Sequence, residues 1–405
     1  MAGMPPNATN QPLDPAAAAA LLWQRLEPQR WPLPLEELPR GCALVGGAVR
    51  DGLLNRLGST PDLDLVVPTA ATSCNQLGRR LARRLGGSLV VLDAERDIAR
   101  VVLGPWNLDL AAQAGGSLEA DLARRDYRIN AMALPLEPQA PLVDPCNGLA
   151  DLAAGQLRAV SEANLLDDPL RLLRGPRLAA ELQFQLDAAT AKLLRRHGAC
   201  LAQVAPERVL AELQKLVACP GAETGLALAQ ELGLLDAWLE PLPGGALAEG
   251  LAEGRAEANL TAEEAASAIP LARLAALFSA TGLARLRSSR RLQQRCQRLR
   301  HWALRLGAGE PLEEAEMLQL CRELEADLPA LVLLAAAATQ GWLQRWRDPA
   351  NPLFHPRPPF DGSTLQSQLG LPPGPALGQL LERLTLARAF GRPHDLEAAK
   401  GLCRD

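Results

Sequence analysis

The sequence predicts an α+β protein in which a small mixed α/β head precedes a long all-helical region. Between Cys42 and Val160, short apolar runs of strand length alternate with a helical stretch at 73–87 whose arginines follow one side. From Glu162 onward the strand signals stop, and glycine and proline divide helical segments. Aromatic residues make up only 3% of the chain whereas apolar residues make up 48%, so the cores must be packed from Leu, Ala and Val, which favours helices over β-sandwiches.

The elements of the head can be placed in chain order. Residues 1–14 are expected to be disordered, and residues 15–26 are expected to form a short helix. The segments with strand-like apolar runs are CALVGG, DLDLVV, SLVVLDA, ARVVLGP and WNLDLAA, at 42–47, 62–67, 88–94, 99–105 and 106–112.

The helical region is divided by segments rich in glycine and proline, at 219–225, 240–250 and 347–362. A chain of 405 residues is long enough for about two to four domains. The expected segments are a leader at 1–28, the head at 29–160, a helical neck at 161–220, a helical body at 221–346 and a helical tail at 347–405.

Composition narrows the class of protein. The eight cysteines are scattered, with no CxxC and no histidine at metal-ligand spacing, which is typical of free thiols in a reducing compartment. The net charge of −4 disfavours indiscriminate binding to polyanions but is compatible with a local basic face. The N-terminus lacks the early positive charge of a secretory signal, and the longest apolar run, 328–339, is shorter than the ~20 residues of a membrane span. We therefore expect a cytoplasmic protein without membrane association.

Two aspartates alternate with leucines in the segment PDLDLVV. Alternate residues of a strand point to the same face, so the carboxylates of Asp62 and Asp64 should lie together. Two close like charges disfavour each other, and a divalent cation relieves that repulsion. Mg²⁺ prefers one or two carboxylates together with substrate phosphates. A lone DxD is more often an edge strand with two solvated aspartates, so the neighbouring motifs decide between these interpretations.

The segment VGGAVRDG, just upstream, is typical of a strand followed by a glycine turn and the start of a helix. Backbone N–H groups at such a turn, with Arg50 one helical step on, can hold a triphosphate. The GxGxxG spacing of a dinucleotide-binding turn is absent.

Further motifs follow in order and carry a family resemblance. They are RRD-x-x-x-N at 124–130, D-x-x-x-G-x-x-DL at 144–152, DD-x-x-R-x-x-R at 167–174 and ER-x-x-x-EL at 207–213. Together with GG-x-VRD and D-x-D, this series resembles the bacterial class II tRNA nucleotidyltransferases, the CCA-adding enzymes, which share a fold with bacterial poly(A) polymerases. The resemblance covers about 175 residues, and the tail after Pro359 is also similar to the family's C-terminal unit. It implies a polymerase-β-like nucleotidyltransferase head.

The resemblance implies roles for the matching residues. Asp62 and Asp64 would hold catalytic Mg²⁺, and Asp109 is a candidate third carboxylate. The residues expected around the nucleotide are Gly46, Gly47, Arg50, Asp51, Arg125, Asp126, Asn130, Asp168, Arg171, Arg174 and Arg177. Among them, Asp51 would brace the glycine turn, and the RRD-x-x-x-N residues would act around the ribose and phosphates.

The family selects its base with the segment that contains Asp168 and Arg171. These residues are three apart, so we expect them on one helical face, where a carboxylate acceptor and a guanidinium donor mimic a complementary base edge. Arg174 and Arg177 would extend that face toward phosphate. The sequence departs from the family at Pro176, which should kink the helix and disturb the placement of Arg177.

The expected partners are the tRNA 3' end and CTP, ATP or both. Members of the family that add all three nucleotides usually carry a flexible loop after the strand that holds Asp109, whereas here only residues 111–117 intervene. We therefore expect CC addition, with full CCA addition and A addition as alternatives. A poly(A) polymerase is the next alternative, although the basic C-terminal extension typical of that subgroup is absent. A non-catalytic RNA-binding protein and a helical scaffold protein are alternatives of a different class, which the intact D-x-D and RRD motifs disfavour.

Overall fold

The computed structural model describes residues 11–243 and 259–403. The expected disorder of residues 1–10 and most of the expected linker at 240–250 lie outside these ranges. The chain divides into two compact units, Met1–Val204 with Glu231–Leu234, and Ala205–Gln230 with Leu235–Asp405. This boundary lies inside the expected neck, and the five-segment division stays a prediction.

The first unit is built on a mixed sheet in the order β3-β4-β5-β2-β1-β6. All five expected strands are confirmed, and Ala133–Pro135 adds a sixth that the sequence interpretation missed because it is short and ends in proline. The strands of this sheet are β1 Ala43–Val45, β2 Leu63–Val67, β3 Ser88–Asp93, β4 Ile98–Leu103, β5 Trp106–Ala112 and β6 Ala133–Pro135. Only β2 and β5 pair in parallel, and the other neighbours are antiparallel.

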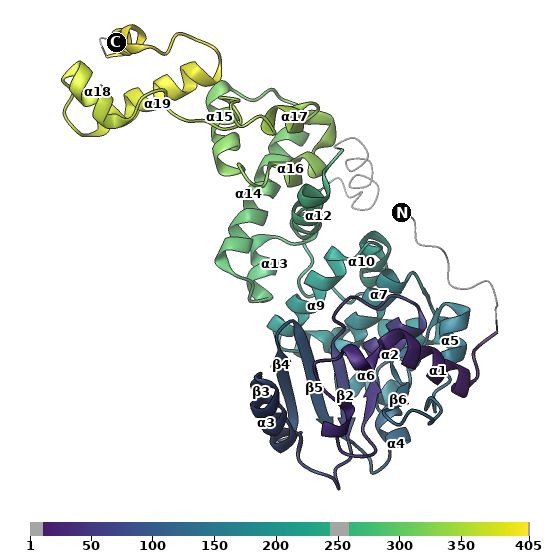
Figure 1. The fold of residues 1–405 in the computed structure, drawn as a ribbon. Coiled ribbons are helices and arrows are strands. Elements are labelled where there is room, and N and C mark those ends of the chain that lie inside the picture. The colour runs from purple at the N-terminus through teal and green to yellow at the C-terminus, as the bar shows by residue number, and fades with distance from the viewer. Residues whose placement is uncertain (1–10, 244–258, 404–405) are drawn as a thin grey trace. The chain divides into compact units, whose positions relative to one another are not determined.

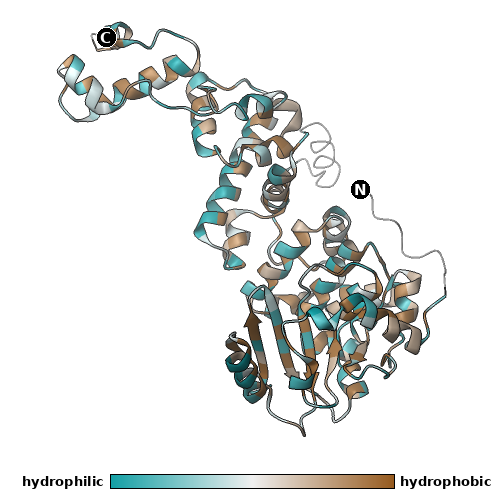
Figure 2. Cartoon of the chain, viewed as in Figure 1, coloured by the Kyte–Doolittle hydropathy of each residue, from teal (hydrophilic) through white to brown (hydrophobic). Residues whose placement is uncertain are grey.

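Helices cover this sheet and continue into the neck. The helices of the first unit are α1 Pro15–Leu26, α2 Gly47–Leu53, α3 Cys74–Leu85, α4 Leu118–Leu122, α5 Gly148–Ala154, α6 Glu162–Asp167, α7 Leu170–Leu182 and α8 Ala188–His197, with 3-10 turns at Pro28–Arg30, Leu35–Glu37, Arg128–Asn130 and Gly198–Gln203. The expected helices at 15–26 and 73–87 are confirmed. Figure 1 shows α3 beside β3, and Figure 2 shows that α3 is largely hydrophilic whereas the strands are mostly apolar.

One carboxylate from another part of the head caps the N-terminus of α3. Asp97, in the β3–β4 turn, accepts hydrogen bonds from the backbone amides of Cys74 at 2.6 Å and Asn75 at 3.1 Å, and from the hydroxyl of Ser73 at 2.9 Å. Burial opposes the charge on Asp97, but these donors outweigh it, so the pKa of Asp97 is lowered. The carboxylate therefore ties the hairpin to the helix that supports the sheet.

We predict that Asp97→Ala lowers the free energy of unfolding at pH 7 by about 1–2 kcal/mol, the usual cost of losing a helix cap. Because the pKa is lowered in the folded state, this contribution is present above the unfolded pKa and is lost as the pH falls through the folded value. Urea unfolding at pH 7 measures the effect. Asp93→Ala is the matched control, since the contacts of Asp93 with the amides of Glu95 and Arg96 and with the guanidinium of Arg96 all lie within its own turn. Equal losses in the two variants would contradict the capping role.

The D-x-x-x-G-x-x-DL motif holds α5 in place. Asp144 accepts from the amides of Gly148 at 2.7 Å and Leu149 at 2.9 Å, and so caps the helix. A Cβ on Gly148 would overlap the carbonyl oxygen of Arg128. These contacts give the motif a structural explanation inside the head.

The neck differs from the sequence interpretation in two places. Strands do not end before Glu162, because β8 Gln185–Leu186 pairs in parallel with β7 Gln156–Leu157. Pro176 lies inside the continuous helix α7, and the kink expected there stays a prediction. Asp168 is not on a helical face, because its backbone is extended between α6 and α7, with φ −138° and ψ 95°. The residue before a proline disfavours the helical region, which explains this break.

The second unit is helical. Its helices are α9 Pro206–Ala218, α10 Ala222–Glu231, α12 Ala262–Leu277, α13 Ala280–Arg285, α14 Arg290–Gly307, α15 Glu314–Glu323, α16 Leu328–Leu334, α17 Trp342–Trp346, α18 Gly362–Leu369, α19 Pro375–Ala389 and α20 Leu396–Leu402, with a 3-10 turn at Ala336–Ala338. Within the described ranges, no helix has both the length and the apolar character needed to cross a membrane.

Candidate active site

The sheet brings the three expected carboxylates together. Asp64 on β2 lies directly opposite Asp109 on the parallel strand β5. Asp62 immediately precedes β2, and its carboxylate accepts from the side-chain amide of Asn107, two residues before Asp109, at 3.1 Å. Paired positions share a face of the sheet. The acidic residues therefore lie on one face, as the alternation in the sequence predicted.

An apolar cluster covers the same face beside the acids. Val45 is the register partner of Asp64, so it shares this face. The buried residues of the cluster are Ala43, Val45, Val66, Leu122, Ala131 and Ala133. This packing fixes the strand positions from which the carboxylates project.

The glycine turn lies against Asp64. Gly46 has φ +71°, a conformation that glycine adopts without strain, and it connects β1 to α2. A Cβ at this position would lie 3.0 Å from Oδ2 of Asp64 and 3.5 Å from Nη1 of Arg125. Any larger residue would crowd the carboxylate of Asp64 and the guanidinium of Arg125, so glycine at this position lets both side chains approach the turn.

Asp109 is bound by an arginine from the next strand. Arg100 donates from Nε to Oδ1 at 2.6 Å and from Nη2 to Oδ2 at 2.7 Å. Among the described residues, no group of three or more His, Cys, Asp or Glu side chains is placed to hold a metal ion. In this conformation Asp109 therefore does not complete a three-carboxylate site with Asp62 and Asp64.

The electrostatics around Asp64 favour a cation. Burial, and then the charge of Asp109, raise the pKa of Asp64 to about 6, although Arg125 acts in the opposite direction. The nearby positive charge is therefore too small to offset the burial of Asp64 and the repulsion from Asp109. The donor set is oxygen only, which suits Mg²⁺ with substrate phosphates as the remaining ligands. The residues present thus fit a divalent cation held by Asp62 and Asp64.

A buried chain of polar side chains joins three of the motifs. Arg50 is only 6% exposed, and it bonds Asp51 through two 2.9 Å contacts and the side-chain oxygen of Asn130 at 2.8 Å. Asn130 donates to Asp126 at 3.2 Å, and Asp126 forms an ion pair with Arg174 at 3.1 Å. Burial opposes the charge on Asp126, but Arg174 and hydrogen bonds from the protein outweigh it and lower its pKa. The guanidinium of Arg50 donates to Asp51 and Asn130, and this geometry supports a role in positioning these residues. Its expected contact with the nucleotide stays a prediction.

Two arginines of α7 that are expected around the nucleotide are bonded to other protein groups. Arg171 donates from Nη1 to the carbonyl oxygens of Arg124 and Asn164, at 2.9 Å each. Arg177 pairs with Glu181 one turn further along α7. Nη1 of Arg171 is used inside the protein, and its Nε–Nη2 edge donates to no residue that the structure describes.

Sequence reasoning missed Arg100, Asn107, Tyr127 and Asn164 as contributors to the site. The tight turn between β4 and β5 could have indicated Arg100. Leu103 pairs with Trp106 across that turn, and counting back along both strands places Arg100 opposite Asp109. Tyr127 and Asn164 act through contacts between segments distant in sequence, for which the sequence carries no local signal.

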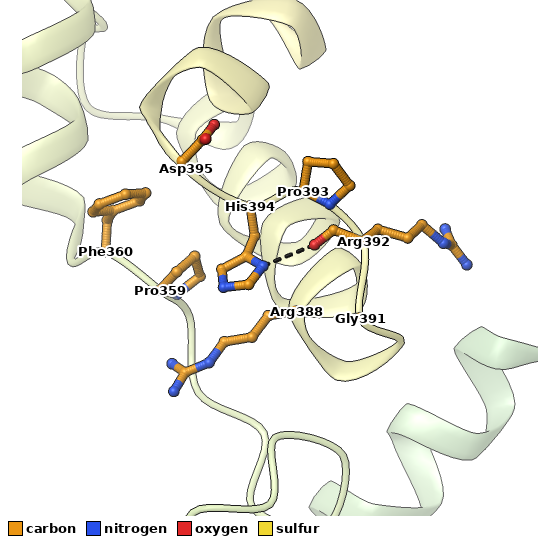
Figure 3. Close-up of a pocket in the computed structure, with 8 residues that line it drawn as sticks. All are labelled: Pro359, Phe360, Arg388, Gly391, Arg392, Pro393, His394 and Asp395. Carbon is orange, nitrogen blue, oxygen red and sulfur yellow. Dashed lines mark hydrogen bonds between the residues drawn. The ribbon is translucent and has the colours of Figure 1, made fainter.

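A cavity lies in the tail. It has a volume of about 650 Å³ and is lined by Pro359, Phe360, Arg388, Gly391, Arg392, Pro393, His394 and Asp395. Figure 3 shows the imidazole of His394 in this cavity, with its Nδ1 donating to the carbonyl oxygen of Arg392 at 2.8 Å. Arg392 also pairs with Glu314. The lining contains one carboxylate and no paired acids, so the cavity does not reproduce the chemistry of the head.

Paired aspartates on a mixed sheet, beside a glycine turn and an arginine, define the chain as a nucleotidyltransferase. The family described as "Poly A polymerase head domain" matches residues 42–158, and the family described as "Probable RNA and SrmB- binding site of polymerase A" matches residues 183–244. A CC-adding tRNA nucleotidyltransferase of Synechocystis sp. is 37% identical over 90% of this chain and 93% of its own length. The chain belongs to the tRNA nucleotidyltransferase family.

Other similar proteins differ in the nucleotide that they add. A CC-adding tRNA nucleotidyltransferase of Thermus thermophilus is 36% identical over 89% of this chain and 93% of its own length. An A-adding tRNA nucleotidyltransferase of Deinococcus radiodurans is 33% identical over 88% and 94%. The structure of a Thermotoga maritima CCA-adding enzyme complexed with tRNA matches with a TM-score of 0.72 at 20% identity, over 97% of this chain and 99% of that one, which shows the fold.

Proposed function

We propose that this chain adds cytidines to the 3' end of tRNA from CTP, releases pyrophosphate and stops after CC. The terminal 3'-hydroxyl attacks the α-phosphate of the incoming nucleotide in line with the departing pyrophosphate. The observation that carries the choice of cytidine is the oriented guanidinium of Arg171, because it offers the base one fixed pair of donors.

A divalent cation held by Asp62 and Asp64, which we propose is Mg²⁺, neutralises charge on the triphosphate and on the attacking oxygen. Gly46 lets Asp64 and Arg125 approach the turn closely, and the backbone N–H groups of this turn, together with Arg125, would bind the phosphates. Arg125, which also pairs with Asp121 at 3.3 Å, supplies fixed positive charge there. Asp109 remains paired with Arg100, and its negative charge adds to that of Asp64 at the cation site. Asp126, Asn130 and Arg174 support the ribose and phosphates from the buried chain described above.

Arg171 supports selection of cytosine by hydrogen-bond chemistry. The Nε–Nη2 edge of a guanidinium presents two parallel donors. The pairing edge of cytosine carries two adjacent acceptors, O2 and N3, whereas that of adenine carries an acceptor beside an amino donor. A fixed pair of donors therefore complements cytosine and leaves the amino group of adenine opposed to a donor. Asp168, placed just before α7, is a candidate acceptor for the 4-amino group, and Arg177 a candidate for phosphate.

The test uses purified protein and tRNAs that end before CCA, after C and after CC, with CTP or ATP offered singly. The proposal expects C addition to the first two and little A addition to the third. Efficient A addition to the CC end would favour a full CCA-adding or A-adding enzyme. Unlimited ATP polymerisation would indicate a poly(A) polymerase, and tRNA binding without incorporation would indicate a non-catalytic RNA-binding protein.

We predict that Arg171→Ala reduces discrimination between CTP and ATP by about 5- to 150-fold, the range expected for one bidentate contact to a base. Arg177→Ala is the matched control on the same helix, and it should weaken both nucleotides alike. Single-turnover incorporation with each nucleotide, alongside tRNA affinity, separates these effects. A loss of tRNA affinity with unchanged base preference would make Arg171 a backbone contact instead.

A further inference from the structure

Helix α7 is tied to the head segment that follows α4. Asn164, in α6, donates from Nδ2 to the carbonyl oxygens of Ala123 at 2.8 Å and Arg125 at 2.7 Å. The carbonyl oxygen of Asn164 accepts from Nη1 of Arg171 at 2.9 Å, and the same nitrogen donates to the carbonyl oxygen of Arg124. The side chain of Arg171 is thus held by two backbone acceptors, which fix the plane of its guanidinium.

The backbone of Arg171 is held as well. Tyr127 is the only tyrosine of the chain and is completely buried, and its hydroxyl donates to the carbonyl oxygen of Arg171 at 2.8 Å. A Cβ on Gly175 would lie 2.5 Å from this hydroxyl oxygen and 2.9 Å from Cδ1 of Leu194. The hydroxyl therefore occupies a gap in α7 that exists because residue 175 has no side chain.

These contacts leave α7 little freedom to rotate against the sheet. The ion pair between Asp126 and Arg174 adds a third tie, one turn beyond Arg171. A helix held in this way presents its donors to the nucleotide in one orientation. A rigid array of donors discriminates between bases because it cannot rearrange to satisfy a different edge.

We propose that Tyr127 is a positioning residue that determines nucleotide specificity. Its hydroxyl holds α7 so that the donor edge of Arg171 stays in the orientation that suits cytosine. Without the hydroxyl, α7 turns more freely and tolerates adenine. This inference rests on the proposed function, since it explains how that site is kept selective.

Tyr127→Phe tests the inference, because it removes the hydroxyl and keeps the ring. Losing the hydrogen bond to the carbonyl oxygen of Arg171 should shift the ratio of kcat/KM for CTP to that for ATP toward ATP by about 2- to 12-fold. The shift should arise from a lower KM for ATP, with kcat for CTP unchanged. Hydrogen exchange of the α7 amides should become faster by a similar factor, because the helix loses one of its ties.

Thr385→Val is the matched control. Thr385 is also buried, and its hydroxyl donates to the carbonyl oxygen of Leu381 at 2.7 Å, but it lies in the tail. This variant should leave the nucleotide ratio and the exchange of α7 unchanged, which separates a specific effect from a general loss of stability.

The outcomes are distinct. A ratio within about twofold of the wild type, below the smallest effect expected of a lost hydrogen bond, overturns the proposal even if α7 exchanges faster. A shifted ratio with unchanged exchange also overturns it, because α7 would then not be the moving part. Efficient A addition by the wild type contradicts the proposed function, and the change in ratio on Tyr127→Phe still tests Tyr127 separately.

Discussion

Asp64→Ala is expected to reduce nucleotide incorporation by at least about 10³-fold, since a catalytic cation contributes several kcal/mol to stabilising the transition state. Asp64 lies between the glycine turn and Asp109, so no other carboxylate can occupy its position on β2. Asp62→Ala should have a similar effect. Single-turnover incorporation of CTP measures both. Turnover close to that of the wild type in either variant would contradict the assignment of the pair.

The isosteric variant Asp64→Asn separates catalysis from folding. The pKa of Asp64 is raised from 3.8 to about 6, first by burial and then by Asp109. A raised carboxyl pKa stabilises the folded state below the unfolded pKa, and that contribution is lost as the pH rises through about 6. At pH 8 without metal, the wild type carries a buried charge that Asp64→Asn lacks, so the variant should be more stable by on the order of 2–3 kcal/mol.

Denaturant unfolding at pH 8 and pH 3 in a chelator measures this difference, which should nearly vanish at the lower pH because pH 3 lies below the unfolded pKa of 3.8. Asp62→Asn is the matched control, and it should change stability little because Asp62 is exposed. Mg²⁺ should stabilise the wild type and not Asp64→Asn. If Asp64→Asn were less stable than the wild type at pH 8, the interpretation that burial and Asp109 destabilise the charged form of Asp64 would be wrong.

The sequence predicts the acidic pair because strand alternation alone decides which side chains share a face. The sequence also predicts that a strand, a glycine turn and a helix follow one another around Gly46, since glycine is favoured where φ is positive. The head fold follows from the same local signals. The sequence interpretation placed Asp168 on a helical face, which is wrong. Pro169 was the local signal against that placement, because the residue before a proline disfavours the helical conformation, and α6 ends at Asp167.

Contacts between distant segments could not be predicted in this way. The hydroxyl of Tyr127 meets the carbonyl of Arg171, 44 residues later in the chain. Arg50 meets Asn130 across 80 residues. Each contact depends on how the sheet and the neck pack together, and a charged residue in a motif gives no indication whether it faces a ligand or a protein partner. Arg50 illustrates this, since its motif implies nucleotide contact whereas its side chain is bonded inside the protein.

The short connection between β5 and α4 is expected to limit the protein to C addition. Ala111 and Ala112 belong to β5, so the connection comprises only residues 113–117. It is also fixed, because the amide of Gln113 donates to the carbonyl oxygen of Val67 at 2.9 Å and that of Ala114 donates to Asp121 at 3.0 Å.

A connection of this length reaches about 3.3–3.6 Å per residue at full extension, and one whose first two residues are hydrogen-bonded to the rest of the head reaches less. It can join strand to helix, but it has no free length with which to displace α7 when the base changes from C to A. We therefore predict robust CTP addition to tRNA that lacks CCA, and weak or no ATP addition to tRNA that ends in CC.

Inserting a longer loop from a full CCA-adding relative between Ala112 and Ser117 should produce A addition. A Gly-Ser insert of equal length is the control, and A addition with that insert too would show that slack alone is sufficient. Efficient ATP incorporation by the unmodified protein would contradict the role of the short connection, while membership of the family would stand.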